Sequence, residues 1–145
     1  MATFKDYLEN NSLLILHGAL GTEMEALGYD ISGKLWSAKY LLEKPEVIQK
    51  IHETYVAAGA DLITTSSYQA TSPGLMEAGL TEKEAEQIIV LTVQLAKNAR
   101  DKVWAALDET EKAKRPYPLI SGDVGPYAAY LSNGSEYSGD YGQIT

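Results

Sequence analysis

Three clusters of polar side chains each follow a short apolar run of the chain. An uninterrupted apolar run before a glycine-bearing turn is typical of a strand that is buried on both faces. Ligands in parallel α/β folds bind at the carboxyl ends of strands, so polar groups at these positions are candidates for one shared site. The candidates are His17 and Glu23 after residues 13–16, Ser67 and Gln69 after residues 61–65, and Asp123 after residues 117–121.

Each candidate also has an ordinary structural interpretation. The imidazole of His17 can contact a ligand, or it can be satisfied by backbone groups inside the protein. Glu23 can equally stabilise the first turn of a helix, and Ser67 and Gln69 are common loop residues. Asp123, flanked by glycines, is the strongest single carboxylate, although an Asx turn would also use it. The coincidence of three polar clusters at three strand ends favours a binding site.

Two other features of the sequence are less informative. The glycines of GALGTE at 18–23 lack the third glycine of a dinucleotide-binding loop and the Lys-Ser/Thr of a P-loop, so a phosphate site is not predicted. His52 stands between Ile51 and Glu53 in a helical segment, and it is predicted to be structural or solvent-facing.

Hydrophobic spacing and stop signals predict a parallel β-α-β-α-β order, which is an α/β fold. The crossovers between the strands are long enough for parallel pairing. The 145 residues are predicted to form a single domain, either a small doubly wound domain or the opening part of a (β/α)8 TIM barrel, which needs about 250 residues. The predicted elements are strands at 13–16, 61–65 and 117–121, a helix from Pro45 to Gly59, a helix from a Thr81–Glu84 capping box to before Pro116, a brief helix at 22–27, an irregular segment at 29–40 and a long loop from 122 to 145.

Composition excludes several classes of partner. The chain has 12 basic and 20 acidic side chains and a formal net charge of −8, which argues against nucleic acid. No apolar run approaches the roughly 18 residues of a membrane span. The absence of Cys excludes disulfides and thiolate metal sites within these residues. No signal peptide is expected, and the cytoplasm is the expected location.

Four segments together resemble the homocysteine S-methyltransferase family, which are zinc-dependent (β/α)8 barrels. The segments are HGALGTEMEALG at 17–28, LWSAKYLLEKPEVI at 35–48, GADLITTSSYQAT at 59–71 and GDVGPYAAYLSNGSEYSGDY at 122–141. Members commonly carry Asp-Gly where this chain has His17–Gly18, and they bind zinc through three cysteines in the C-terminal half. The resemblance therefore implies the N-terminal portion of such a barrel, its first three strands, with the zinc ligands outside this chain.

The resemblance also implies a reaction. Homocysteine, activated as a zinc-bound thiolate, would take a methyl group from S-methylmethionine or S-adenosylmethionine and become methionine. No catalytic or metal-binding residue is expected within the chain, and the isolated chain is expected to be inactive. The residues expected to bind substrate are His17, Glu23, Ser67, Gln69, Asp123 and Tyr127, the last of which would help to shield the site from water.

Two alternatives from other functional classes stay open at this point. One is a non-catalytic binding or assembly module that self-associates through an open sheet edge. The other is a different TIM-barrel enzyme, a lyase or a hydrolase, that works through Asp123 and His17.

Overall fold

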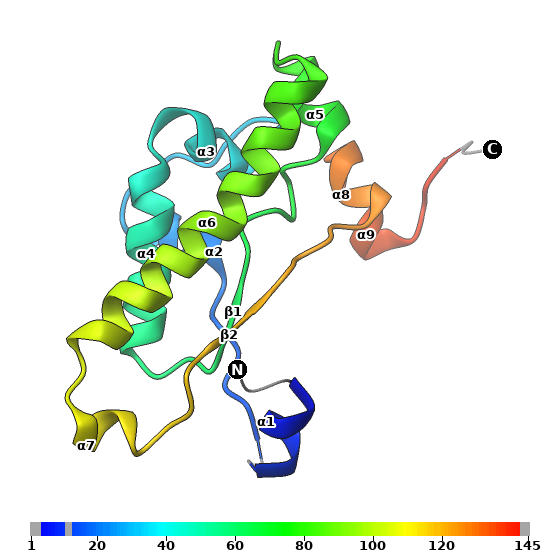
Figure 1. The fold of residues 1–145 in the computed structure, drawn as a ribbon. Helices are drawn as coiled ribbons and strands as arrows, with labels where there is room; N and C mark the ends of the chain where they lie inside the picture. The colour runs from blue at the N-terminus through cyan, green and yellow to red at the C-terminus, as the bar shows by residue number, and fades with distance from the viewer. Residues whose placement is uncertain (1–3, 11–12, 143–145) are drawn as a thin grey trace.

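The computed structural model describes residues 4–10 and 13–142 (Figure 1). Helices dominate the described chain, and the two named strands are short. The elements in chain order are α1 (Phe4–Asn10), α2 (Leu20–Ala26), the 3-10 helix η1 (Trp36–Ala38), α3 (Lys39–Glu43), α4 (Pro45–Ala57), β1 (Leu62–Thr64), α5 (Ser72–Glu77), α6 (Glu82–Ala106), α7 (Glu109–Lys112), β2 (Leu119–Ser121), α8 (Tyr127–Leu131) and α9 (Ser135–Ser138).

The sheet is parallel, as predicted. Leu62 of β1 lies opposite Leu119 of β2. On the other side of β1, Leu16 forms an isolated parallel bridge to Leu62, and the backbone N–H of His17 donates to the Leu62 carbonyl at 2.8 Å. The three segments therefore lie in the order in which they occur along the chain, with β1 in the middle. Both named strands are shorter than the predicted runs.

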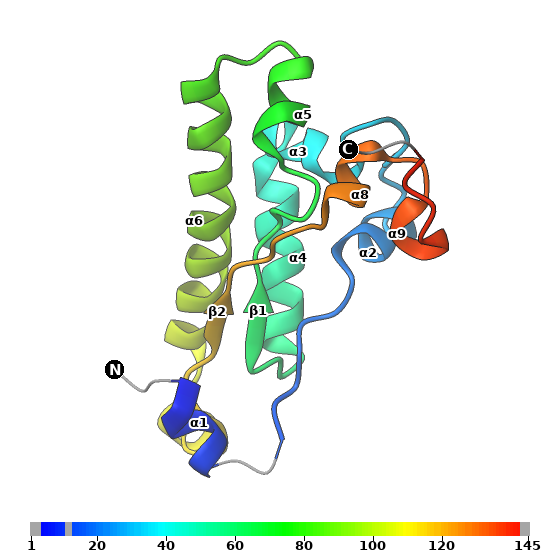
Figure 2. The same ribbon diagram turned by 90° about the vertical axis from the view of Figure 1, so that its right-hand side faces the viewer.

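The first apolar run is the clearest departure from the predicted elements. It makes one bridge instead of a strand, and Leu13, Ile15 and Leu16 are 70%, 53% and 58% exposed, so the prediction of burial on both faces is wrong. Burial on both faces needs packed layers on both sides of a strand. Among the described residues, the long helices α4 and α6 pack together beside β1 and β2 (Figure 2), and this run lies outside that contact.

The helix α4 begins at Pro45, as the sequence predicts, and ends at Ala57, two residues before the predicted stop at Gly59. Pro45 occupies the first turn, where its missing N–H costs no hydrogen bond. Val47, Ile48 and Ile51 form its buried face. Gly59 follows the helix with a φ of 106°, a left-handed conformation that a residue with a Cβ rarely adopts.

The helix α6 begins with the predicted capping box. The Thr81 hydroxyl accepts from the Glu84 N–H at 3.3 Å, and the Glu84 carboxylate accepts from the Thr81 N–H at 2.8 Å. Leu95, Ala96 and Ala99 are among the buried residues on its inner face. The two long helices thus supply the apolar layer that supports the strands.

Two segments predicted to be irregular contain helices. Residues 29–40 include η1 and the start of α3, and the loop after residue 122 includes α8 and α9, so these predictions are wrong there. Tertiary burial explains α8, because Ala128 and Ala129 are fully buried although this five-residue helix has no side-chain cap. Residues 143–145 of that predicted loop lie outside the described residues. No helix in the described ranges is long and apolar enough to cross a bilayer.

Candidate functional site

A cavity of about 560 Å³ opens at the carboxyl ends of the three parallel segments. This volume is within the usual range for sites that bind small molecules. Each parallel segment contributes polar groups to its lining, and the helices contribute aromatic ones. The lining includes His17, His52, Gln69 and Asp123 together with Trp36, Tyr68 and Tyr137.

A second, more open cavity of about 930 Å³ lies beside the first. It is lined mainly by residues 28–34 and by Leu131 and Ser132, and it shares Glu25, Ile31 and Trp36 with the smaller cavity. We place the candidate site in the smaller cavity, because that cavity lies at the strand ends and contains the buried titratable side chains.

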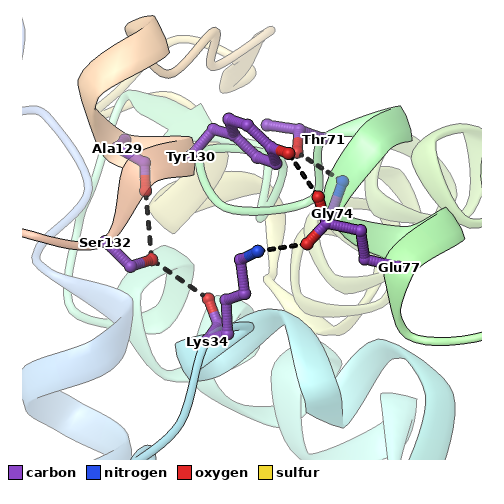
Figure 3. Close-up of polar contacts among 7 residues, drawn as sticks. All are labelled: Lys34, Thr71, Gly74, Glu77, Ala129, Tyr130 and Ser132. Atoms are coloured by element: carbon purple, nitrogen blue, oxygen red, sulfur yellow. Dashed lines mark hydrogen bonds and ion pairs between the residues drawn. The ribbon is translucent and has the colours of Figure 1, made fainter.

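A polar network holds the segment before Trp36 against α5 and α8 (Figure 3). The carboxylate of Glu77 in α5 accepts from the Lys34 ammonium and from the Tyr130 hydroxyl. The Lys34 ammonium also lies 5.3 Å from the Tyr130 ring centroid, and the Ser132 hydroxyl donates to the Lys34 carbonyl at 3.3 Å. Lys34 and Ser132 line the larger cavity, so these contacts position one wall of that cavity.

Two histidines form a buried pair in the cavity wall. The Nε2 atom of His17 lies 2.8 Å from the Nδ1 atom of His52, and the two residues are 7% and 0% exposed. Burial lowers the pKa of His17 to about 4, and burial together with the neighbouring His17 lowers the pKa of His52 to about 3. Both rings are therefore neutral at pH 7, and the prediction that His52 could face solvent is wrong.

Three residues at the strand ends close a ring of hydrogen bonds. The backbone N–H of Asp123 donates to the Thr65 hydroxyl at 2.9 Å, and the Ser67 hydroxyl donates to the Asp123 carbonyl at 2.6 Å. Thr65 and Ser67 share a further hydrogen bond of 2.6 Å between their hydroxyls. Because Ser67 uses its proton on Asp123, the Thr65 hydroxyl is the donor in this bond. The ring fixes the backbone that carries the Asp123 carboxylate.

The Asp123 carboxylate itself stays available to a ligand. It accepts no hydrogen bond from the described residues, and burial raises the pKa of this carboxyl above its usual value. The loops after β1 and β2 meet closely beside it, because a Cβ on Gly125 would lie 2.2 Å from the Tyr68 carbonyl oxygen. Only glycine fits this contact.

The structure brings together some of the predicted site residues. His17, Gln69 and Asp123 line the cavity, and Ser67 holds the Asp123 backbone. Glu23 in α2 and Tyr127 in α8 are not part of the lining, and Tyr127 is instead 56% exposed with its ring 5.7 Å from that of Tyr130.

Sequence reasoning did not predict His52, Trp36 or Tyr137 as part of the cavity lining. His52 lies four residues after the buried Ile48, so helical spacing would have placed it on the buried face of α4. Trp36 and Tyr137 carry no comparable signal, because they reach the cavity through the packing of the η1 and α9 segments.

The described residues do not fit a metal site. They contain no group of three or more His, Cys, Asp or Glu side chains placed to hold a metal ion, and the sequence has no Cys. The His17–His52 pair uses one nitrogen of each ring on the other ring. The polar side chains of this cavity are therefore suited to binding and positioning a ligand rather than to holding a metal ion.

Comparison with known proteins confirms the resemblance. Residues 14–145 match the family model for homocysteine S-methyltransferase. The chain is 45% identical over 141 residues to homocysteine S-methyltransferase YbgG of Bacillus subtilis (strain 168), covering 97% of this chain and 44% of that protein. It is 43% identical over 128 residues to homocysteine S-methyltransferase 1 of Zea mays, covering 88% of this chain and 40% of the relative.

A solved structure agrees with these matches. The crystal structure of the homocysteine methyltransferase MmuM from Escherichia coli in its metallated form superposes with a TM-score of 0.83 at 43% identity, covering 95% of this chain and 46% of that chain. The chain thus spans less than half the length of these relatives. The matches are to methyltransferases, which sets aside the lyase or hydrolase alternative. On the family match and these relatives, the chain belongs to the homocysteine S-methyltransferase family.

Proposed function

We propose that this chain forms part of the substrate site of an enzyme that transfers a methyl group from a sulfonium donor to the thiol of homocysteine. The observation that carries the proposal is the cavity at the strand ends in a chain of this family. In the reaction, the homocysteine sulfur loses its proton to solvent and attacks the methyl carbon. An S–CH3 bond forms, the donor C–S bond breaks with its electron pair on the donor sulfur, and methionine and a neutral thioether result.

The charges of the cavity support a cationic donor. Two carboxylates, those of Glu25 and Asp123, belong to its lining, whereas none of the described lining residues is Lys or Arg. S-Methylmethionine and S-adenosylmethionine both carry a sulfonium and an ammonium group, so both fit this lining. Neutral imidazoles in the wall do not oppose a cation. We propose these two compounds as donors, and homocysteine as the acceptor.

The proposed roles of the individual residues follow their positions. Asp123 supplies a carboxylate to a ligand ammonium, His17 and Gln69 supply neutral polar contacts, and Ser67 orients the Asp123 backbone. For Glu23 we propose an indirect role through Tyr55. Burial and the charge of Glu23 raise the pKa of Tyr55, and the Tyr55 ring packs on His17 at 4.3 Å.

Tyr127 has a separate proposed role. Its ring packs beside Tyr130 in α8, and the Tyr130 hydroxyl donates a hydrogen bond to Glu77, which also accepts from Lys34 in the wall of the larger cavity. We propose that Tyr127 shields the bound substrates from water once they occupy the site.

Three further parts of the proposal concern the complete protein. The zinc dependence of the reaction is proposed with ligands outside residues 1–145, because the described residues do not form a metal cluster. The three parallel segments in chain order are proposed to be the opening strands of a (β/α)8 barrel. We also propose a cytoplasmic location for the complete protein.

Self-association of the 145-residue chain is also proposed. Among the described residues, β2 pairs on one side only, and Leu13, Leu16 and Val124 expose apolar side chains near the strands. An unpaired edge with apolar neighbours favours pairing with a second copy. Sedimentation velocity at rising concentration tests this, and a monomer at every concentration would reject it.

Methyl transfer is tested in the complete protein that contains this chain. The assay measures methionine formed from homocysteine with each sulfonium donor, and product with at least one donor is expected. Asp123→Asn should raise KM by about 10-fold or more, because a hydrogen bond to a charged group contributes about 1.5–3 kcal/mol. Asp140→Asn, an exposed position outside the cavity lining, is the matched control. No product with either donor would overturn the proposed function.

A further inference from the structure

The histidine pair has a property that neither ring has alone. A neutral imidazole has one N–H donor and one bare acceptor nitrogen. The bond between His17 Nε2 and His52 Nδ1 uses one donor and one acceptor, so the choice made by one ring dictates the choice of the other. If His17 donates, both rings carry their proton on Nε2. If His52 donates, both rings carry it on Nδ1.

The surroundings hold both rings in place. The Tyr55 ring packs on His17 at 4.3 Å, and its hydroxyl donates to the Ala19 carbonyl at 3.2 Å. A Cβ on Gly18 would lie 2.4 Å from the Tyr55 ring, so the backbone next to His17 fits closely against the same aromatic. His52 is fully buried in α4. The mutual bond of the two imidazoles is therefore made between rings with fixed planes.

The outer nitrogens of the pair meet no other side chain. Neither Nδ1 of His17 nor Nε2 of His52 has a hydrogen bond of regular geometry among the described residues, and both atoms are buried. The Gly18 backbone acts on the His17 ring and raises its pKa, against the larger lowering by burial. The bond to His52 is the one side-chain hydrogen bond described for either ring.

We propose that His52 is a positioning residue for the cavity: its Nδ1 holds the His17 imidazole, and the two neutral rings share one tautomer. This role of His52 deepens the proposed function. The predicted effect on ligand binding rests on that function, and the shared tautomer does not. The charged groups lining the same cavity are the carboxylates of Asp123 and Glu25. A neutral pair leaves the attraction of these carboxylates for a cation undiminished, whereas a protonated pair would oppose it.

The test reads the tautomers directly. Long-range ¹H–¹⁵N correlation spectra of the ¹⁵N-labelled chain distinguish the two neutral tautomers and the protonated ring for each histidine. The sequence contains two histidines, so the assignment needs one variant, His17→Gln. At pH 7.5 we expect two neutral rings with the same tautomer. Opposite tautomers, or a protonated ring at this pH, would overturn the proposal.

Two variants at position 52 separate positioning from mere packing. His52→Leu keeps a buried apolar side chain and removes the partner of Nε2, so His17 should change tautomer or exchange between both. His52→Asn keeps a polar atom near the position of Nδ1 and should restore one tautomer. An unchanged His17 spectrum in His52→Leu would overturn the positioning role. If circular dichroism shows that His52→Leu does not fold, the tautomers of the wild type and of His52→Asn still test the proposal.

Ligand binding provides the second readout. S-Methyl-L-methionine is titrated by calorimetry at pH 7.5 into the complete protein that contains this chain, as the wild type and with each of the two substitutions. We expect an affinity at least 10-fold weaker for His52→Leu and within about threefold of wild type for His52→Asn. An equal loss in both variants would overturn positioning through the hydrogen bond. Absence of binding to every form, with shared tautomers in the spectra, counts against the proposed function and supports the pair.

Discussion

Replacing Thr65 by Val is expected to open the hydrogen-bond ring at the strand ends. Valine has nearly the shape of threonine, so the change removes the hydroxyl that accepts from the Asp123 N–H and donates to Ser67. A typical hydrogen bond contributes about 1 kcal/mol, and an unpaired buried N–H adds a penalty. Thr65 is 3% exposed, so water cannot replace the lost partner. The free energy of unfolding should fall by about 2–3 kcal/mol.

Urea unfolding followed by far-UV circular dichroism measures this loss. With slopes of about 1–3 kcal/mol per M, the midpoint should drop by about 1–2 M. Thr64→Val is the matched control, because Thr64 lies next to Thr65 on β1 and its hydroxyl makes no hydrogen bond to the described residues. Its effect should stay within about 0.5 kcal/mol. A Thr65→Val loss no larger than that of the control would refute the reasoning.

A double-mutant cycle with Ser67→Ala tests whether the hydroxyls act as one ring. Each single change breaks the ring, so the second change should cost less in the presence of the first. A coupling of about 1 kcal/mol is expected, as is usual for residues in one hydrogen-bond network. Additive losses would show that the contacts of Thr65 and Ser67 are independent.

Three further outcomes are expected in the same unfolding assay. Gly125→Ala should destabilise the protein by about 2 kcal/mol or more, since its Cβ would meet a backbone carbonyl at 2.2 Å, whereas Gly122→Ala, with open space around its Cβ, should not. Lowering the pH from 8 to 5 should lower the free energy of unfolding by about 2 kcal/mol for each of His17 and His52. The unfolded imidazoles, with a pKa of 6.5, bind protons over this range, whereas the folded ones, with pKa values of about 4 and about 3, do not. A free energy of unfolding that is flat from pH 8 to pH 5 would contradict the neutral pair. Thr81→Ala should cost about 1 kcal/mol through loss of the helix cap, and an unchanged midpoint would show that the cap contributes nothing.

The starts of α4 and α6 could be predicted from the sequence because their signals are local, whereas α6 ends at Ala106, short of the predicted end before Pro116. Pro45 in the first turn of α4 and the Thr81–Glu84 capping box satisfy or avoid the free N–H groups of a helix start within a few residues. The same holds for Gly59, whose left-handed conformation follows from the lack of a Cβ. These features depend on nearest neighbours along the chain and little on the rest of the fold.

The parallel order and the gathering of polar groups at the strand ends could also be predicted, because crossover length and strand direction constrain them. The burial of residues 13–16 could not be predicted, since it depends on which layers cover each side of the run. Leu13 and Leu16 are exposed in the structure. The helix α8 escaped prediction for the same reason, because the burial of Ala128 is a tertiary contact.

The candidate site also has features that the sequence predicts and features that depend on tertiary packing. The sequence by itself determined that His17, Gln69 and Asp123 follow the three parallel segments, and all three line the cavity. Only the tertiary structure decided that His52 lies 2.8 Å from His17, and that Thr65 and Ser67 bind the Asp123 backbone across more than fifty residues of chain. Spacing along a chain specifies which face of an element a residue occupies, whereas the partner it meets depends on how separate elements pack.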